Sequence, residues 1–159
     1  MCGIIGIINK DGKPANKWIV DQYQDQQARG TKGFGVILVD KNGDYLIHRA
    51  TTEAKALLDL HYNEAPIIFM HHRWPTSSEN KLQQTHPITI NDGSLKHKYL
   101  FLHNGIIKND YELKTNHEKL GFVYTTYDKE TFKFNDSESA AIEVARFIEK
   151  QIKKIAAEG

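Results

Sequence analysis

The sequence predicts an α+β fold in which antiparallel β-sheets are covered by helices. Short apolar runs rich in β-branched residues recur along the chain, most loops between them have hairpin length, and helical patterns lie near both ends. Few connections are long enough for a parallel crossover, which favours antiparallel pairing. A length of 159 residues suits one domain, so we expect a single domain over residues 1–159.

The chain begins with a predicted strand and a predicted helix. Residues 2–9 are predicted to form a fully buried strand, because the run is apolar and largely β-branched and a Lys-Asp-Gly-Lys-Pro turn signal follows it. A helix is expected over residues 16–29, where Trp18, Ile19 and Tyr23 lie near one face.

The central part of the chain is predicted to contain a hairpin and then alternating strands and helices. The hairpin strands flank Lys41-Asn42-Gly43, and Asn-Gly is a strong signal for a tight turn. The expected elements are hairpin strands over 34–40 and 44–49, a helix over 53–62, strands over 66–72, 87–90 and 98–103, and a helix over 110–120.

The longest predicted helix covers residues 136–157. Its apolar residues recur at helical spacing, namely Ile142, Ala145, Ile148, Ile152 and Ile155. A basic run over 150–154 lies near its C-terminal end. The helix dipole favours positive charge at that end, so we assign this run no function.

Composition and charge exclude several classes of function. Lys and Arg number 21 against 20 Asp and Glu, and a formal net charge of +1 gives no electrostatic case for binding nucleic acid or a membrane surface. We find neither a signal peptide nor an apolar stretch near the roughly 18 residues of a membrane span. A single cysteine excludes an internal disulfide. We therefore expect a cytoplasmic protein.

Cys2 directly follows the initiator Met1. Once Met1 is removed, Cys2 would carry a sulfur nucleophile and a free α-amine on one residue. Their reference pKa values, about 8.5 and about 7.7–8.0, make proton exchange between them nearly thermoneutral, so the amine could serve as the base. The alternative is that Cys2 is an ordinary small apolar residue that opens a buried strand.

Three groups of polar residues stand where predicted elements begin or end, which is where a rigid scaffold presents site residues. The first offers a guanidinium able to hold a carboxylate, the second an Asn-Gly pair able to donate to an oxyanion, and the third a carboxylate before a helix. Each also has a structural interpretation, as a surface ion pair, a hairpin turn or a helix N-cap. The groups are residues 71–76, 103–105 and 135–138.

Four of the eight histidines, His71, His72, His86 and His103, raise the question of a metal site. Adjacent residues of a strand point to opposite faces, so His71 and His72 cannot easily share one ion. Neither an HExxH nor a CxxC motif accompanies them. We therefore predict no metal and no cofactor.

Taken together and in chain order, the motifs form a specific set. They are Cys2-Gly3-Ile4-Ile5-Gly6-Ile7, Arg29-Gly30 with Gly35, His71-His72-Arg73-Trp74-Pro75-Thr76, His86-Pro87, His103-Asn104-Gly105-Ile106-Ile107 with Asn109 and Glu112-Leu113, and Asp136-Ser137-Glu138. This set resembles the class II glutamine amidotransferase domain, the N-terminal-nucleophile (Ntn) glutaminase found in glucosamine-6-phosphate synthase and asparagine synthetase.

The resemblance implies a four-layer α/β/β/α sandwich of two antiparallel sheets, the Ntn-hydrolase fold. It implies Cys2 as the nucleophile with its own α-amine as the base, and the Asn104 side chain and the Gly105 backbone N–H as oxyanion donors. The residues implied to bind substrate are Arg73 for the α-carboxylate, Asp136 for the α-ammonium, Trp74, Thr76 and His86 for the pocket wall, and Arg29 beside Cys2.

The reaction implied by the resemblance is hydrolysis of L-glutamine to glutamate and ammonia through a γ-glutamyl thioester. Because Arg73 and Asp136 would pair both charges of a free amino acid, free glutamine should be preferred over peptide-bound glutamine. We recognise no synthetase or acceptor domain in the sequence, so the ammonia is expected to pass to a separate acceptor enzyme.

The sequence departs from the family at three places. Pro75-Thr76-Ser77-Ser78 replaces the commoner Ala-Thr-His-Gly, the serine that often stands two residues ahead of Gly35 is absent, and segment 124–134 has no counterpart that we can align. Two other functions stay open. One is an Ntn hydrolase of another γ-glutamyl or amide substrate, and the other is an inactive glutamine-sensing module whose α-amine is blocked by Met1.

Overall fold

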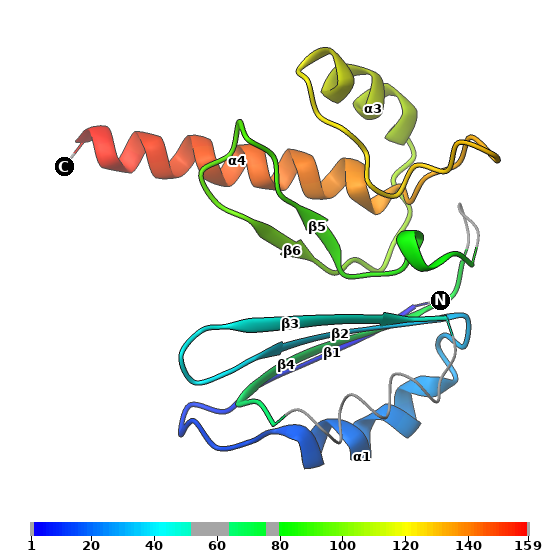
Figure 1. The fold of residues 1–159 in the computed structure, drawn as a ribbon, viewed down its shortest axis with the longest axis vertical. Helices are drawn as coiled ribbons and strands as arrows, with labels where there is room; N and C mark the ends of the chain where they lie inside the picture. Colours follow the sequence, from blue (N-terminus) through cyan, green and yellow to red (C-terminus); the bar gives the residue numbers. More distant parts are fainter. Residues whose placement is uncertain (1, 52–63, 76–79, 159) are drawn as a thin grey trace.

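The computed structural model describes residues 2–51, 64–75 and 80–158. The helix predicted over 53–62 lies outside the described residues. The elements, labelled as in Figure 1, are β1 (Gly3–Ile8), α1 (Asn16–Gln27), β2 (Gly33–Val39), β3 (Tyr45–Ala50), β4 (Ile67–Arg73), the 3₁₀ turn η1 (Leu82–Gln84), β5 (Ile88–Ile90), β6 (Tyr99–Phe101), α3 (Asp110–Lys119) and α4 (Ser137–Glu158).

The strands form two antiparallel sheets. The first has the order β1-β4-β2-β3, and the second pairs β5 with β6. Figure 1 shows α1 against the outer face of the first sheet, the second sheet on its other face, and α4 over the second sheet. The predicted α+β class and the four-layer α/β/β/α arrangement are therefore confirmed.

The lower core lies between α1 and the first sheet. Ile19 and Tyr23, one helical turn apart, are fully buried there against residues such as Phe34 and Met70. Trp18 was expected near the same face, but its side chain is 67 % exposed. A step of one residue turns the side chain by about 100° around the helix, which carries Trp18 off the packed face.

β1 differs from the fully buried strand that its apolar run predicts. The order of the sheet places β1 at an edge, next to β4. Ile5 and Ile7 pack on the lower core, whereas Ile4 and Ile8 are 42 % and 60 % exposed. An edge strand with one covered face buries alternate residues, and the long apolar run conceals this alternation.

The upper core lies between the second sheet, α3, α4 and segment 124–134. Ile88, Phe122, Tyr124 and Phe134 contribute to it together with Ile142 of α4. The predicted apolar stripe of this helix is buried only in its first half, because the second half extends past the short second sheet (Figure 1). Ile152 and Ile155 are accordingly exposed.

Arg49 of β3 ties the two sheets together. Its Nε atom donates to the carbonyl of Pro87 at 2.9 Å, and its guanidinium also donates to Oγ1 of Thr89 at 3.1 Å. Nearby, a Cβ atom placed on Gly35 would lie 1.8 Å from the carbonyl oxygen of His86, so only glycine allows β2 to approach this closely. These contacts fix His86 between the sheets. Among the described helices, none combines the length and apolarity that a membrane span requires.

Candidate active site

One narrow pocket opens where the start of β1, the end of β4 and the start of α4 come together. It is nearly closed, with a cavity volume of about 20 Å³. Figure 1 shows the start of β1 at the same end of the molecule as the start of α4. The lining residues are Cys2, Arg73, Trp74, Pro75, His86, His103, Gly105, Asn135, Asp136 and Ser137.

Cys2 reaches this pocket because β1 and β4 are antiparallel neighbours. Gly3 lies opposite His72, so Cys2, the residue before β1, stands beside Arg73, the last residue of β4. The sulfur of Cys2 accepts a hydrogen bond from the Trp74 backbone N–H at 3.4 Å and lies 3.7 Å from the Trp74 carbonyl oxygen. The thiol is partly exposed at the pocket, as a nucleophile must be.

The backbone carbonyl of Cys2 is held by two side chains. Arg29 donates to it through Nε at 3.2 Å, and Asn104 donates through Nδ2 at 3.0 Å. Arg29 follows α1 and Asn104 follows β6, so side chains from two different layers of the sandwich bind the same carbonyl oxygen. The Asn104 amide carries two protons, and this contact uses one of them.

Gly105 lines the pocket directly after Asn104. A Cβ atom at Gly105 would lie 2.7 Å from Nε2 of His103, so a larger residue would displace the His103 ring. That ring is fixed on its other side, where Nδ1 lies 3.0 Å from Oγ of Ser137. Glycine therefore lets its backbone stand beside Cys2 without moving the pocket wall.

Arg73 and Asp136 bring opposite charges to the pocket. Both are buried, with 3 % and 4 % of their surface exposed. Burial lowers the pKa of Arg73, while the charges of Cys2 and Asp136 raise it. Oδ2 of Asp136 accepts the backbone N–H of Ile107 at 2.7 Å, which fixes the orientation of the carboxylate. A ligand that carries both a carboxylate and an ammonium group would match these two charges.

His71 and His86 form an uncharged wall. Their rings stack with centroids 4.1 Å apart. Burial lowers the pKa of His71 to about 4 and the pKa of His86 well below its usual range, so both are neutral near pH 7. Both nitrogens of the His86 ring are buried and have no hydrogen-bond partner among the described residues.

His72 lies on the opposite face of β4, with its ring 4.7 Å from that of Tyr23. The prediction that His71 and His72 point apart is therefore confirmed. Within residues 2–51, 64–75 and 80–158, no group of three or more His, Cys, Asp or Glu side chains is placed to hold a metal ion.

The pocket thus brings together six of the nine predicted site residues: Cys2, Arg73, Trp74, His86, Gly105 and Asp136. Asn104 and Arg29 contact Cys2 from outside that lining. Thr76 lies outside the described residues.

Glu138 supports the pocket in a way that the sequence does not reveal. Its buried carboxylate accepts four hydrogen bonds, from the backbone N–H and the hydroxyl of Thr125 at 2.7 and 2.8 Å and from those of Thr126 at 2.9 and 2.6 Å. The Thr126 hydroxyl in turn accepts the backbone N–H of Asn135 at 2.9 Å. Segment 124–134 is therefore joined to the wall that carries Asp136.

Asn135 is fixed from a second direction, because its Nδ2 donates to the carbonyl of Gln84 at 2.8 Å. Gln84 belongs to the η1 turn, 51 residues earlier in the chain. From the sequence, the position of Asn135 before a helix indicates only a capping role. The structure shows this role too, since Oδ1 of Asn135 accepts the N–H of Ser137 at 3.0 Å. No local spacing signals the long-range contacts.

Curated relatives of this chain include amidophosphoribosyltransferases and glutamine–fructose-6-phosphate aminotransferases. The amidophosphoribosyltransferase of Escherichia coli is 29 % identical over 138 residues, covering 82 % of this chain and 26 % of that protein. The glutamine–fructose-6-phosphate aminotransferase of Sulfurisphaera tokodaii is 30 % identical over 128 residues, covering 78 % and 21 %. That of Lactiplantibacillus plantarum is 27 % identical over 157 residues, covering 95 % and 23 %. The chain is a homologue of class II glutamine amidotransferase domains.

Solved amidotransferase structures share the fold. The glutamine phosphoribosylpyrophosphate amidotransferase of B. subtilis superposes with a TM-score of 0.63 at 17 % identity, over 81 % of this chain and 27 % of that one. A regulatory enzyme of purine biosynthesis gives a TM-score of 0.62 at 18 % identity, over 78 % and 26 %. No family model matches the chain. The predicted resemblance to class II glutamine amidotransferase domains and the predicted fold are confirmed.

The amidotransferase relatives are much longer than this chain, which spans about a fifth to a quarter of their length. The roles of individual residues and the single-domain organisation stay predictions.

Proposed function

We propose that this chain hydrolyses free L-glutamine to glutamate and ammonia, with Cys2 as the nucleophile. The observation that carries the proposal is the convergence of a partly exposed thiol, a buried guanidinium and a buried carboxylate on one pocket. Cys2, Arg73 and Asp136 come from three separate segments, and a free amino acid carries the charges that match the last two.

The first step is attack of the Cys2 sulfur on the side-chain amide carbon of glutamine. The α-amine of Cys2, exposed by removal of Met1, takes the thiol proton and later gives it to the departing nitrogen, which leaves as ammonia. Water then attacks the thioester carbonyl, the S–C bond breaks, and glutamate leaves with the thiol restored. A cytoplasmic location suits this chemistry, because a reducing compartment keeps the thiol free.

The oxyanion that forms during both attacks would be stabilised by Asn104 and Gly105. The contact between Asn104 Nδ2 and the Cys2 carbonyl holds the amide within reach of the nucleophile, and the second amide proton can point to the oxyanion. The backbone N–H of Gly105, at the pocket lining, is the second donor.

The head group of glutamine would be held by the two buried charges. Arg73 would bind the α-carboxylate with its planar fork of donors, and Asp136 the α-ammonium. Trp74 and His86 would complete the wall, and the two His86 ring nitrogens offer further polar contacts. A peptide-bound glutamine would carry neither the free carboxylate nor the free ammonium group that these two charges match, which predicts preference for the free amino acid.

The amide nitrogen would then pass to an acceptor. Two relatives are named glutamine–fructose-6-phosphate aminotransferase and amidophosphoribosyltransferase. Both names describe transfer of a nitrogen-containing group to a sugar phosphate. For this chain we propose that the acceptor is bound by a separate enzyme that takes up the ammonia.

The experiment is glutamate release from L-glutamine by the purified chain, with intact mass measured on the same sample to establish that Met1 is absent. Cys2→Ala is the control. We expect glutamate and ammonia in equal amounts from the native chain and none from the variant, with glutamine binding retained in both. Turnover that persists in Cys2→Ala would contradict the proposal.

A further inference from the structure

The basic run near the end of α4 is not explained by the helix dipole. α4 continues to Glu158, and its last turn holds no basic residue. The favourable effect of the dipole on positive charge falls off within that last turn. Lys150 and Lys153 therefore need another explanation, contrary to the sequence-based interpretation.

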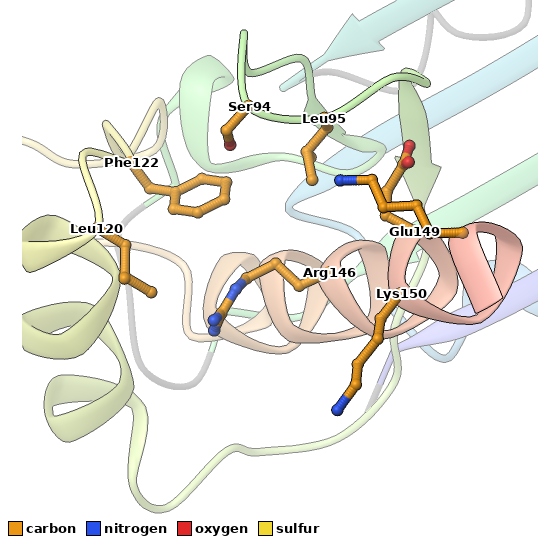
Figure 2. A pocket seen from close by; sticks show the side chains of 8 residues that line it. Ser94, Leu95, Leu120, Phe122, Arg146, Glu149 and Lys150 are labelled. Carbon is orange, nitrogen blue, oxygen red and sulfur yellow. The ribbon is translucent and has the colours of Figure 1, made fainter. Parts of the chain in front are cut away.

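These two lysines line a pocket on the side of α4. Figure 2 shows the helix forming one wall, the loop with Ser94 and Leu95 the second, and the segment that follows α3 the third. The pocket has a volume of about 390 Å³, within the range of about 300–1,000 Å³ that is typical of small-molecule sites. The lining residues are Ser94, Leu95, Leu120, Phe122, Arg146, Glu149, Lys150 and Lys153.

The walls opposite the helix are apolar. Figure 2 shows that the side chains facing α4 are those of Leu95, Leu120 and Phe122. Leu120 is apolar but 55 % exposed. An apolar group of a ligand would remove mainly the Leu120 side chain from water, at about 25 cal/mol per Å² of apolar area, since only 6 % of Phe122 is exposed.

The helix wall carries a surplus of positive charge. Arg146 is paired with Glu143 at 2.7 Å, whereas neither Lys150 nor Lys153 forms an ion pair with a described residue. Glu149 offsets one of these two charges, and its Oε1 is held by the backbone N–H of His97 at 2.8 Å, by Nδ1 of His97 at 2.9 Å and by the Tyr99 hydroxyl at 3.0 Å, so one positive charge remains in surplus. The pocket therefore favours an anion.

We propose that this pocket binds a small organic anion, a carboxylate or phosphate ester that carries an apolar group. Its charge lies against Lys150 and Lys153, and its apolar part against Leu95, Leu120 and Phe122. At 1.5 Å per residue, the lysines stand about 20 to 24 Å along α4 from Ser137, so the pocket is separate from the candidate active site.

The test uses 8-anilinonaphthalene-1-sulfonate, an aromatic anion whose fluorescence rises in apolar surroundings, and its uncharged relative N-phenyl-1-naphthylamine. Two variants of the full chain form a matched pair. Lys153→Glu changes a lining residue, and Lys154→Glu makes the same change one position on, outside the pocket. Lys154 has only an exposed contact to Glu158 at 3.7 Å, so its replacement perturbs the fold little.

We expect saturable binding of the sulfonate to one site at low ionic strength, and weaker binding of the uncharged relative. Lys153→Glu should weaken sulfonate binding about tenfold, as expected for reversing one charge near the ligand, and Lys154→Glu should change it less than about twofold. Amide chemical shifts of Leu95 and Phe122 should move on titration.

Three outcomes would overturn the proposal: no saturable binding up to about 1 mM, equal binding of the charged and uncharged probes, or equal effects of the two variants. Binding is measured on Cys2→Ala as well, so the result does not depend on turnover.

Discussion

Nδ2 of Asn104 donates a hydrogen bond of 3.0 Å to the backbone carbonyl of Cys2, although 102 residues separate the two in the chain. Cys2 precedes the first strand of one sheet, and Asn104 follows the last strand of the other. The contact therefore forms only when both sheets are stacked. It places the proposed oxyanion donor beside the proposed nucleophile.

Replacing Asn104 tests this relationship. Asn104→Ala should lower kcat for glutamine hydrolysis by about 10²–10³ and leave KM nearly unchanged, because an oxyanion donor acts on the transition state. Steady-state glutamate release measures both constants. Asn109→Ala is the control, since Asn109 makes no side-chain cap at the start of α3. A change confined to KM would show that Asn104 does not serve the oxyanion.

Asp136 is tested with a pair of substrates. Asp136→Asn keeps an oxygen for the N–H of Ile107 but removes the negative charge. It should raise KM for glutamine about 10- to 100-fold, as for loss of a charged hydrogen bond. With 4-carbamoylbutyrate, which lacks the α-ammonium, kcat/KM should hardly change. Equal losses for the two substrates would assign Asp136 a structural role.

Glu138→Gln should destabilise the fold and weaken substrate binding together. The amide offers one oxygen and an NH₂ group in place of two oxygens, so two of the four hydrogen bonds from Thr125 and Thr126 are lost. We expect a loss of about 1–3 kcal/mol in the free energy of unfolding, measured in urea, and a higher KM for glutamine.

The matched control for Glu138 is Glu130→Gln. The Glu130 side chain is 86 % exposed, and its contact with Lys81 is at the surface. Stability and KM should both stay near the native values. A Glu138→Gln protein with native KM would contradict the view that this carboxylate positions the wall that carries Asp136.

Acid should destabilise the protein through His71. Burial lowers the pKa of His71 from 6.5 to about 4, so between these pH values the unfolded chain binds more protons than the folded one. The stabilisation is therefore complete above about pH 6.5 and is lost as the pH falls towards 4, by about 3 kcal/mol for this residue. Urea unfolding at a series of pH values measures the slope.

His71→Gln removes the titrating group and keeps a side-chain donor for the His103 carbonyl, which His71 Nε2 contacts at 3.0 Å. The fall in stability between pH 6.5 and 4 should be smaller in this variant. An unchanged slope would mean that His71 is not the responsible histidine.

Much of the fold follows from local sequence. Apolar runs, the Asn42-Gly43 turn and the stop at Gly121, whose φ is +92°, locate the strands and helices within a few residues. Local patterns do not show which elements pack against each other. β1 was wrongly predicted to be fully buried because an apolar run does not show that the strand lies at an edge, and the same limitation applies to Trp18.

The candidate site could likewise be predicted only in part. Cys2, Arg73, Gly105 and Asp136 were found because the family motif carries them, and the structure brings all four to one pocket. The support from Glu138 was missed, since its partners belong to segment 124–134, which has no counterpart in the motif. A buried carboxylate with four donors is visible only in three dimensions.

The central claim, that Cys2 attacks the side chain of glutamine, is tested most directly by covalent labelling with a diazoketone analogue of glutamine, followed by peptide mass spectrometry. On protein that has lost Met1, we predict one label per chain, located on Cys2 and prevented by excess L-glutamine but not by 4-carbamoylbutyrate at the same concentration. The absence of a label, or a label on any other residue, would contradict the account.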